Sequence, residues 1–141
     1  MTTISNSRKK DLLCKANSAL EKQKVILSGD NTILEGYNGQ VASLSVSIAM
    51  SGLMPTLAIF YQDKPDGNVK KAFRRNVLDA IARMIILDKP KWKLEMEAGE
   101  YSEKLLRYSD NYKDNKELIQ EIIDCAIALK QVVRTYKLVK S

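Results

Sequence analysis

A long stretch without charge constrains the fold of this chain more than any other feature. No Asp, Glu, Lys or Arg occurs from residue 36 to residue 62. Apolar residues in its first part are spaced three and four apart, which places them on one face of a helix. They are Leu34, Tyr37, Val41, Leu44 and Ile48. Gly52 suits the end of this helix, and Pro55 suits the first turn of the next. The stretch therefore predicts two helices joined by a glycine corner.

Two other interpretations of this stretch are open. Residues 44–48 alternate between apolar and polar, as in a half-buried strand, but the helical spacing extends over about 15 residues. A membrane span needs about 20 apolar residues. Four serines and the sequence Gly-Leu-Met-Pro interrupt the stretch, so we do not expect it to cross a membrane.

Helical spacing of apolar residues continues along the rest of the chain. We expect a first helix from Ser5 or Ser7 to residues 28–29, and a cap for the central helix at Asp30-Asn31. Three more helices are expected over residues 69–87, 100–111 and 115–139, with Asn68 capping the first of these. The sequence predicts an all-α fold, a compact bundle of five to six helices, in a single domain over residues 1–141.

Composition argues against several kinds of chemistry. The chain has no histidine, so the commonest general base and metal ligand are absent. Cys14 and Cys125 are far apart and are expected to be buried thiols. The one carboxylate cluster is Glu95, Glu97, Glu100 and Glu103, which we interpret as a solvated acidic face rather than a Mg²⁺ site. We therefore expect no enzymatic activity, no cofactor and no metal.

Basic residues have a more informative distribution. The net charge is +6, with +5 over residues 69–91, −4 over 92–127 and +4 over 128–141. Helical spacing would pair Lys70 with Arg74 and Lys71 with Arg75, and would align a second stripe on the last helix. That stripe comprises Lys130, Arg134 and Lys137, with Lys140 beyond it. Such residues can neutralise phosphates without reading bases. Tyr61, Trp92 and Tyr112 are candidates for base stacking or for core packing.

The charge-free unit resembles a known family. A helix that begins near Tyr37 and ends at Ser51-Gly52-Leu53, followed by residues 56–61 (Thr-Leu-Ala-Ile-Phe-Tyr), looks like the small helical subunit of the Cmr module. That module is the RNA-guided effector complex of type III-B CRISPR systems. Ser51 stands where the family has an Asn-like residue. Of the family's C-terminal Trp-Leu-Lys element, only Leu129 and Lys130 are present, after Ala128.

The resemblance implies a non-catalytic subunit that acts in antiviral defence. Members stack in a short filament and contact crRNA and target RNA, while other subunits of the effector complex cleave. The opposite charges of neighbouring segments favour weak head-to-tail self-association. No apolar signal region precedes Arg8, so a cytoplasmic location without membrane contact is expected. The alternatives are a helical protein–protein adaptor without nucleic-acid binding and a metal-dependent nuclease that uses the glutamate cluster.

Overall fold

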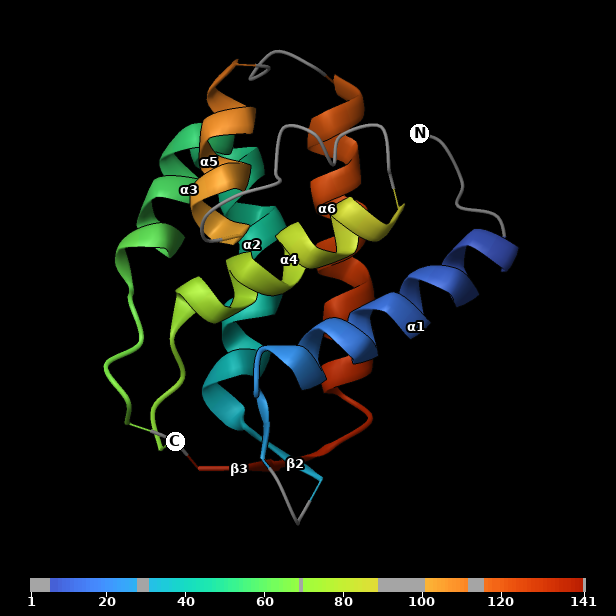
Figure 1. The fold of residues 1–141 in the computed structure, drawn as a ribbon, viewed down its shortest axis with the longest axis vertical. Coiled ribbons are helices and arrows are strands. Elements are labelled where there is room, and N and C mark those ends of the chain that lie inside the picture. Colours follow the sequence, from blue (N-terminus) through green and yellow to red (C-terminus); the bar gives the residue numbers. More distant parts are fainter. Residues whose placement is uncertain (1–5, 28–30, 69, 89–100, 112–115, 141) are drawn as a thin grey trace.

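The computed structural model describes residues 6–27, 31–68, 70–88, 101–111 and 116–140. Within these residues the chain forms six helices and three short strands (Figure 1). The helices are α1 (Asn6–Lys22), α2 (Glu35–Ser51), α3 (Leu53–Gln62), α4 (Arg74–Asp88), α5 (Tyr101–Asn111) and α6 (Lys116–Val133). The strands are β1 (Ile26–Leu27), β2 (Thr32–Leu34) and β3 (Lys137–Val139). The predicted all-α bundle of five to six helices is confirmed, with a small sheet added to it.

The helices enclose one hydrophobic core. α2 packs along α6, α1 packs on α4 and α6, and α5 covers α3 and α4. Large apolar side chains from every helix are fully buried there, including Leu12, Leu44, Leu57, Ile81, Leu105 and Ile122. Burial of each contributes about 1.5–3 kcal/mol. Within the described residues, no helix combines the length and the apolar character needed to cross a bilayer.

The charge-free stretch lies at the centre of this packing. Tyr37, Val41, Leu44 and Ile48 are all buried on one face of α2, as their spacing predicts. Residues 44–48 are helical, so the strand interpretation is wrong. Gly52 has φ 91° and forms the corner between α2 and α3, where the hydroxyl of Thr56 donates to its carbonyl at 2.9 Å. The predicted glycine corner is confirmed.

The end of α1 differs from the prediction. The helix ends at Lys22, and not near residues 28–29. The N–H of Lys24 donates to the carbonyl of Glu21, and the N–H of Val25 donates to that of Leu20. This is a Schellman motif, whose left-handed position is usually filled by glycine. Here Lys24 fills it, with φ 58°. The predicted boundary was wrong because it relied on a glycine to mark the helix end.

Two other predicted helix boundaries, the start of the central helix and the end of the last helix, are wrong because strands of the small sheet lie there. β2 pairs antiparallel with β1 and parallel with β3, with Leu34 opposite Val139. α2 therefore begins after Leu34, which makes no side-chain cap, and the predicted cap at Asp30-Asn31 is wrong. The last helix ends at Val133 and not at residue 139. The Tyr136 hydroxyl, beyond the helix, donates to Asn17 of α1, so contacts with distant segments hold the chain in this turn.

The start of α4 also differs from the prediction. The helix begins at Arg74, and its first N–H donates to the carboxylate of Asp63 at 2.8 Å. The predicted cap, Asn68, instead accepts the N–H of Lys70 within a loop. The capping residue thus lies eleven positions upstream, where no local pattern marks it. Lys70 and Lys71 consequently belong to a loop, and the helical pairs Lys70–Arg74 and Lys71–Arg75 do not form.

The remaining predictions concern α5, the two cysteines and several aromatic and acidic residues. In α5, Leu105 and Tyr108 are buried as predicted. Cys125 is buried as predicted, whereas Cys14 is exposed because it lies on the solvent side of α1. Other predictions concern residues outside the described ones: Trp92, Glu95, Glu97, Glu100 and Tyr112.

Candidate nucleic-acid interface

Basic side chains gather at one end of the molecule, which we call the sheet end. It comprises the three strands with the residues next to them, and the described residues of the segment that joins α3 to α4, 63–68 and 70–73. The strands lie at the bottom of Figure 1, and the segment from α3 to α4 reaches down to their level. Three segments distant in sequence contribute exposed lysines to it. These lysines are Lys24, Lys64, Lys70, Lys71, Lys137 and Lys140. The fold therefore brings together cations that the sequence places on separate helices.

The six lysines of the sheet end form no ion pair within the described residues. Elsewhere, Lys15 binds Asp11 and Arg107 binds Glu103, at 2.7 Å and 2.6 Å. Acidic residues are also present at the sheet end: Glu35, Asp63 and Asp66. Asp63 caps α4 and pairs with Arg74, and Asp66 accepts the N–H of Asn68. The lysines can therefore meet an anion without losing an ion pair among these residues.

Arg74 and Arg75 differ in what they can contact. Arg74 is exposed and lies 3.7 Å from the carboxylate of Asp63. Arg75 is only 9% exposed; its Nε donates to the carbonyl of Tyr61 at 2.6 Å, and its guanidinium lies 3.9 Å from the centre of that ring. Arg75 thus joins α4 to α3. Tyr61, considered above for base stacking, stacks on this arginine.

The predicted stripe of Lys130, Arg134 and Lys137 does not exist as one helical face. Lys130 is half-buried on α6, Arg134 is exposed in the turn after it, and Lys137 is exposed on β3. The strand carries Lys137 and Lys140 beneath the bundle, because β3 pairs with β2 rather than continuing α6. Lys137 and Lys140 therefore lie at the start of β3 and directly after it, at the same end of the molecule as the segment that carries Lys70 and Lys71 (Figure 1).

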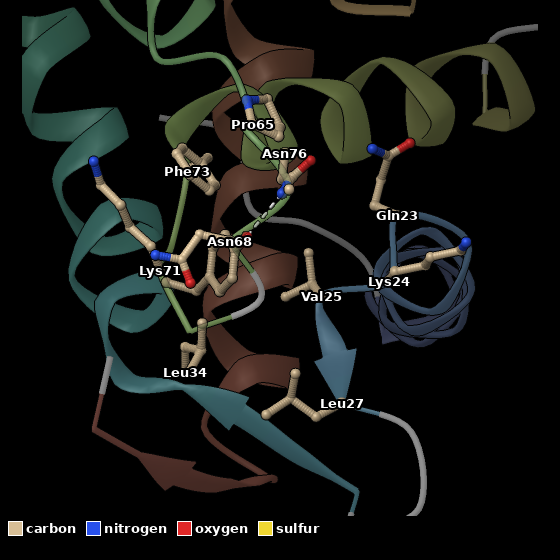
Figure 2. A pocket seen from close by; sticks show the side chains of 12 residues that line it. Gln23, Lys24, Val25, Leu27, Leu34, Pro65, Asn68, Lys71, Phe73 and Asn76 are labelled. Carbon is tan, nitrogen blue, oxygen red and sulfur yellow. Dashed lines mark hydrogen bonds between the residues drawn. The ribbon is translucent and has the colours of Figure 1, made fainter.

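A pocket of about 220 Å³ opens at the sheet end (Figure 2). The end of α1, the strands, the start of α2 and residues 65–76 all contribute to its walls. Val25, Leu34 and Phe73 supply apolar surface, and Lys24 and Lys71 are among the lining residues. Sequence analysis did not identify this pocket. Its walls come from four separate segments, and no single stretch carries a signal for it.

Hydrogen bonds order the polar side chains of this pocket. The Asn76 amide donates to the Tyr37 hydroxyl at 2.8 Å, the dashed line in Figure 2. The Gln23 amide donates to Asp79 at 3.3 Å and accepts from Arg83, so both of its ends are engaged. Asn76 Oδ1 has no hydrogen-bond partner among the described residues. The pocket therefore presents an oriented amide beside a buried tyrosine hydroxyl.

Metal binding was considered for the glutamate cluster. Among the described residues, no group of three or more Cys, Asp or Glu side chains is arranged to hold a metal ion. Glu103 pairs with Arg107, and the other three glutamates lie outside those residues. The described geometry offers no constellation from which a metal-dependent reaction could be derived.

Three large apolar side chains of α2 and α3 are exposed. Val46 and Met50 on α2 and Ile59 on α3 are each more than half exposed. They come from the charge-free stretch, whose other face is buried. Exposed apolar side chains that cluster are typical of protein contact sites.

Comparison with known proteins does not identify a relative. No protein-family model, no curated protein and no solved structure matches this chain. Its function must be argued from its own residues.

Proposed function

We propose that this chain is a non-catalytic small subunit of a type III-B CRISPR (Cmr) effector, acting in antiviral defence. It would contact the backbone of crRNA or target RNA. The observation that carries the proposal is the group of exposed lysines at the sheet end, which have no ion-pair partners among the described residues. The resemblance of the Tyr37–Tyr61 unit to the Cmr family supports the same role.

The chemistry of the surface suits a phosphate backbone. Lysine ammonium groups bind phosphates as point charges and carry no base specificity. Arg134 and Arg74 flank the lysines and extend the surface. Each phosphate contact on a single strand releases counterions, so binding should weaken with salt by about 0.7 log units per contact for each tenfold increase in salt. RNA binding at this end should be sequence-blind and salt-sensitive.

Self-association and partner subunits are part of the same proposal. α5 and the first half of α6 expose acidic residues such as Asp110 and Glu117, whereas the sheet end is basic. Surfaces of opposite sign at different places on one molecule favour a heterologous, head-to-tail contact. Exposed charges provide specificity more than affinity, so copies should associate weakly outside the complex.

Charge removal tests the proposed RNA surface. The test variant carries Lys71→Gln, Lys137→Gln and Lys140→Gln. The matched control carries Lys9→Gln, Lys10→Gln and Lys116→Gln, three exposed lysines outside the sheet end with the same change in net charge. RNA affinity is measured against salt on the complex assembled with its partner subunits. The test variant should flatten the log–log salt slope by about 2, and the control should not.

Other outcomes would favour other functions. Equal slopes in wild type and test variant would exclude these lysines as the RNA contacts. If the variant also co-purified normally with its partners, the adaptor alternative would gain support, with Val46, Met50 and Ile59 as its contact surface. Purified chain should not cleave labelled RNA with Mg²⁺ or Mn²⁺. Cleavage abolished by EDTA and by Glu97→Ala would support the nuclease instead.

A further inference from the structure

We propose that the pocket at the sheet end takes up one unpaired base of the bound RNA. The inference rests on the proposed RNA-binding function and adds a ligand to it: a nucleobase of a single strand, held apart from its neighbours. It predicts that this chain does more than bind phosphates.

The size and walls of the pocket suit a single base. Its volume of about 220 Å³ is below the range of about 300–1,000 Å³ that is common for drug-sized ligands. Pro65 and Phe73 line it from the segment between α3 and α4, Val25 lines it from the residue before β1, and Leu34 lines it from β2. Single-stranded RNA is commonly bound by placing its bases against aromatic and apolar side chains. The walls are therefore apolar: Pro65 is exposed, and Val25, Leu34 and Phe73, each at most 4% exposed, present only part of their side chains to the pocket.

Polar groups in the pocket match the edge of a base. Asn76 donates to the Tyr37 hydroxyl, so its amide is oriented, and Asn76 Oδ1 has no partner among the described residues. The Tyr37 hydroxyl accepts that bond and keeps its own proton to donate. An acceptor and a donor therefore lie side by side. Each base carries neighbouring donors and acceptors on its pairing edge, so the pair can bind a base that has left its partner.

The rim of the pocket suits the phosphates that flank a base. Lys24 and Lys71 lie on opposite sides in Figure 2, with their ammonium groups directed outward. Lys71 Nζ is 5.3 Å from the centre of the Phe73 ring, which ties the cation to the apolar wall. None of the residues that line the pocket is acidic. An inserted base would thus have a cation near each neighbouring phosphate.

Lys24 provides a second reason to regard this rim as a binding element. Its φ of 58° is a conformation that glycine adopts without strain and lysine does not. Residues held in such conformations are frequent at ligand sites, where the side chain is needed. A lysine at this position places a charge at the pocket, which glycine could not do.

The experiment compares two RNA probes on two protein variants. One probe is a short single-stranded RNA, and the other is the same strand with abasic sugars, which keeps every phosphate and loses the bases. Asn68→Trp places a large side chain at the mouth of the pocket. Gln62→Trp is the matched control, because Gln62 is also exposed and uncharged and does not line the pocket.

Wild type and Gln62→Trp should bind normal RNA about tenfold more tightly than abasic RNA, a typical value for one stacked base. Asn68→Trp should bind the two probes equally, with an unchanged salt slope, since no phosphate contact is lost. Cross-links from 4-thiouridine RNA should map to Phe73 or Tyr37 in wild type and disappear in Asn68→Trp.

Three results would overturn the inference. Asn68→Trp could discriminate between the probes as well as wild type does. Wild type itself could bind abasic RNA as tightly as normal RNA, a comparison that needs no protein variant and therefore no assumption about folding. Mononucleotides could bind in the pocket while RNA does not bind at all, which would also remove the proposed function. In the first two cases salt-sensitive RNA binding would survive, so the failure of the pocket and the failure of the function are distinguishable.

Discussion

The sheet end and the opposite, helical end of this molecule differ in whether their basic side chains form ion pairs. The helical end comprises α5, residues 116–124 of α6, the corner between α2 and α3, and Arg8, which packs on α6. There, Arg8 lies 2.6 Å from Glu121 and 3.6 Å from Asp124, and Arg107 lies 2.6 Å from Glu103. At the sheet end, six exposed lysines have no such partner among the described residues. Both ends carry basic side chains. At the helical end Arg8 and Arg107 are paired with carboxylates, whereas the described lysines of the sheet end are available to bind a ligand.

The two ends also differ in how the backbone turns. The corner of the helical end uses Gly52 at φ 91°, and glycine adopts positive φ without a steric penalty. The loop of the sheet end also has a glycine at φ 91°, Gly67, but the end of α1 there uses Lys24 at φ 58°. Natural proteins tend to depart from the rules of stability where a function requires it. The difference teaches that the sheet end retains features that cost stability, as the proposed binding role would require.

The largest effect should come from opening the buried ion pair of the helical end. Glu121 is 3% exposed, so Glu121→Ala leaves Arg8 without its closest partner. Removing one member of a buried pair costs about 3–5 kcal/mol, and because Arg8 keeps some solvent contact and Asp124, we expect about 2–3 kcal/mol. Urea unfolding measures the loss. An unchanged midpoint would mean that the pairing at this end does not contribute to stability.

The next effect should come from the glycine corner. Gly52→Val forces a β-branched residue to positive φ and should cost about 1–2 kcal/mol. A side chain there has space, since the nearest atom to an added Cβ is Pro55 Cδ at 3.7 Å, so any loss reflects backbone conformation. Gly39→Ala is the control: Gly39 lies within α2 with nothing within 4 Å, and alanine there should stabilise the helix. Equal melting temperatures for Gly52→Val and wild type would contradict the corner assignment.

A smaller effect of opposite sign is expected at the sheet end. Lys24→Gly relieves a left-handed lysine and should stabilise the protein by about 0.5–1 kcal/mol. The same change removes a cation from the rim of the pocket, so RNA affinity should fall. Thermal unfolding measures the gain in stability, and RNA titration measures the loss of RNA affinity. A loss of stability would show that the lysine side chain supports the fold rather than binding.

The smallest effect is expected for the exposed ion pair of the helical end. Arg107 and Glu103 are as close as Arg8 and Glu121, but the Arg107 side chain is 68% exposed. Exposed pairs contribute little, so Arg107→Ala should change stability by less than about 0.5 kcal/mol. Compared with Glu121→Ala, it separates the effect of burial from that of distance. Equal losses in the two variants would contradict that separation.

Local sequence patterns were sufficient to predict the buried helix faces and the glycine corner of this protein, although not every helix boundary. The spacing of Tyr37, Val41, Leu44 and Ile48 placed them on one buried face of α2, because burial selects the helical period directly. Gly52 marked the corner, since few residues other than glycine tolerate its φ. Leu105 and Tyr108 of α5 were predicted inward for the same reason as the residues of α2. These signals are local, so they could be read before the fold was known.

Only the tertiary structure decided the sheet end. α4 is capped by Asp63 from eleven residues away, β2 pairs with segments from both sides of it in sequence, and Lys24 replaces the glycine that would have marked the end of α1. The cap of α4 and the pairing of β2 with β3 depend on contacts between distant segments, which override local propensity. The Lys24 turn is local, but it contains no glycine that would mark it in the sequence. The lysine group and the pocket follow from them, because both are assembled from pieces that become neighbours only when the core has formed.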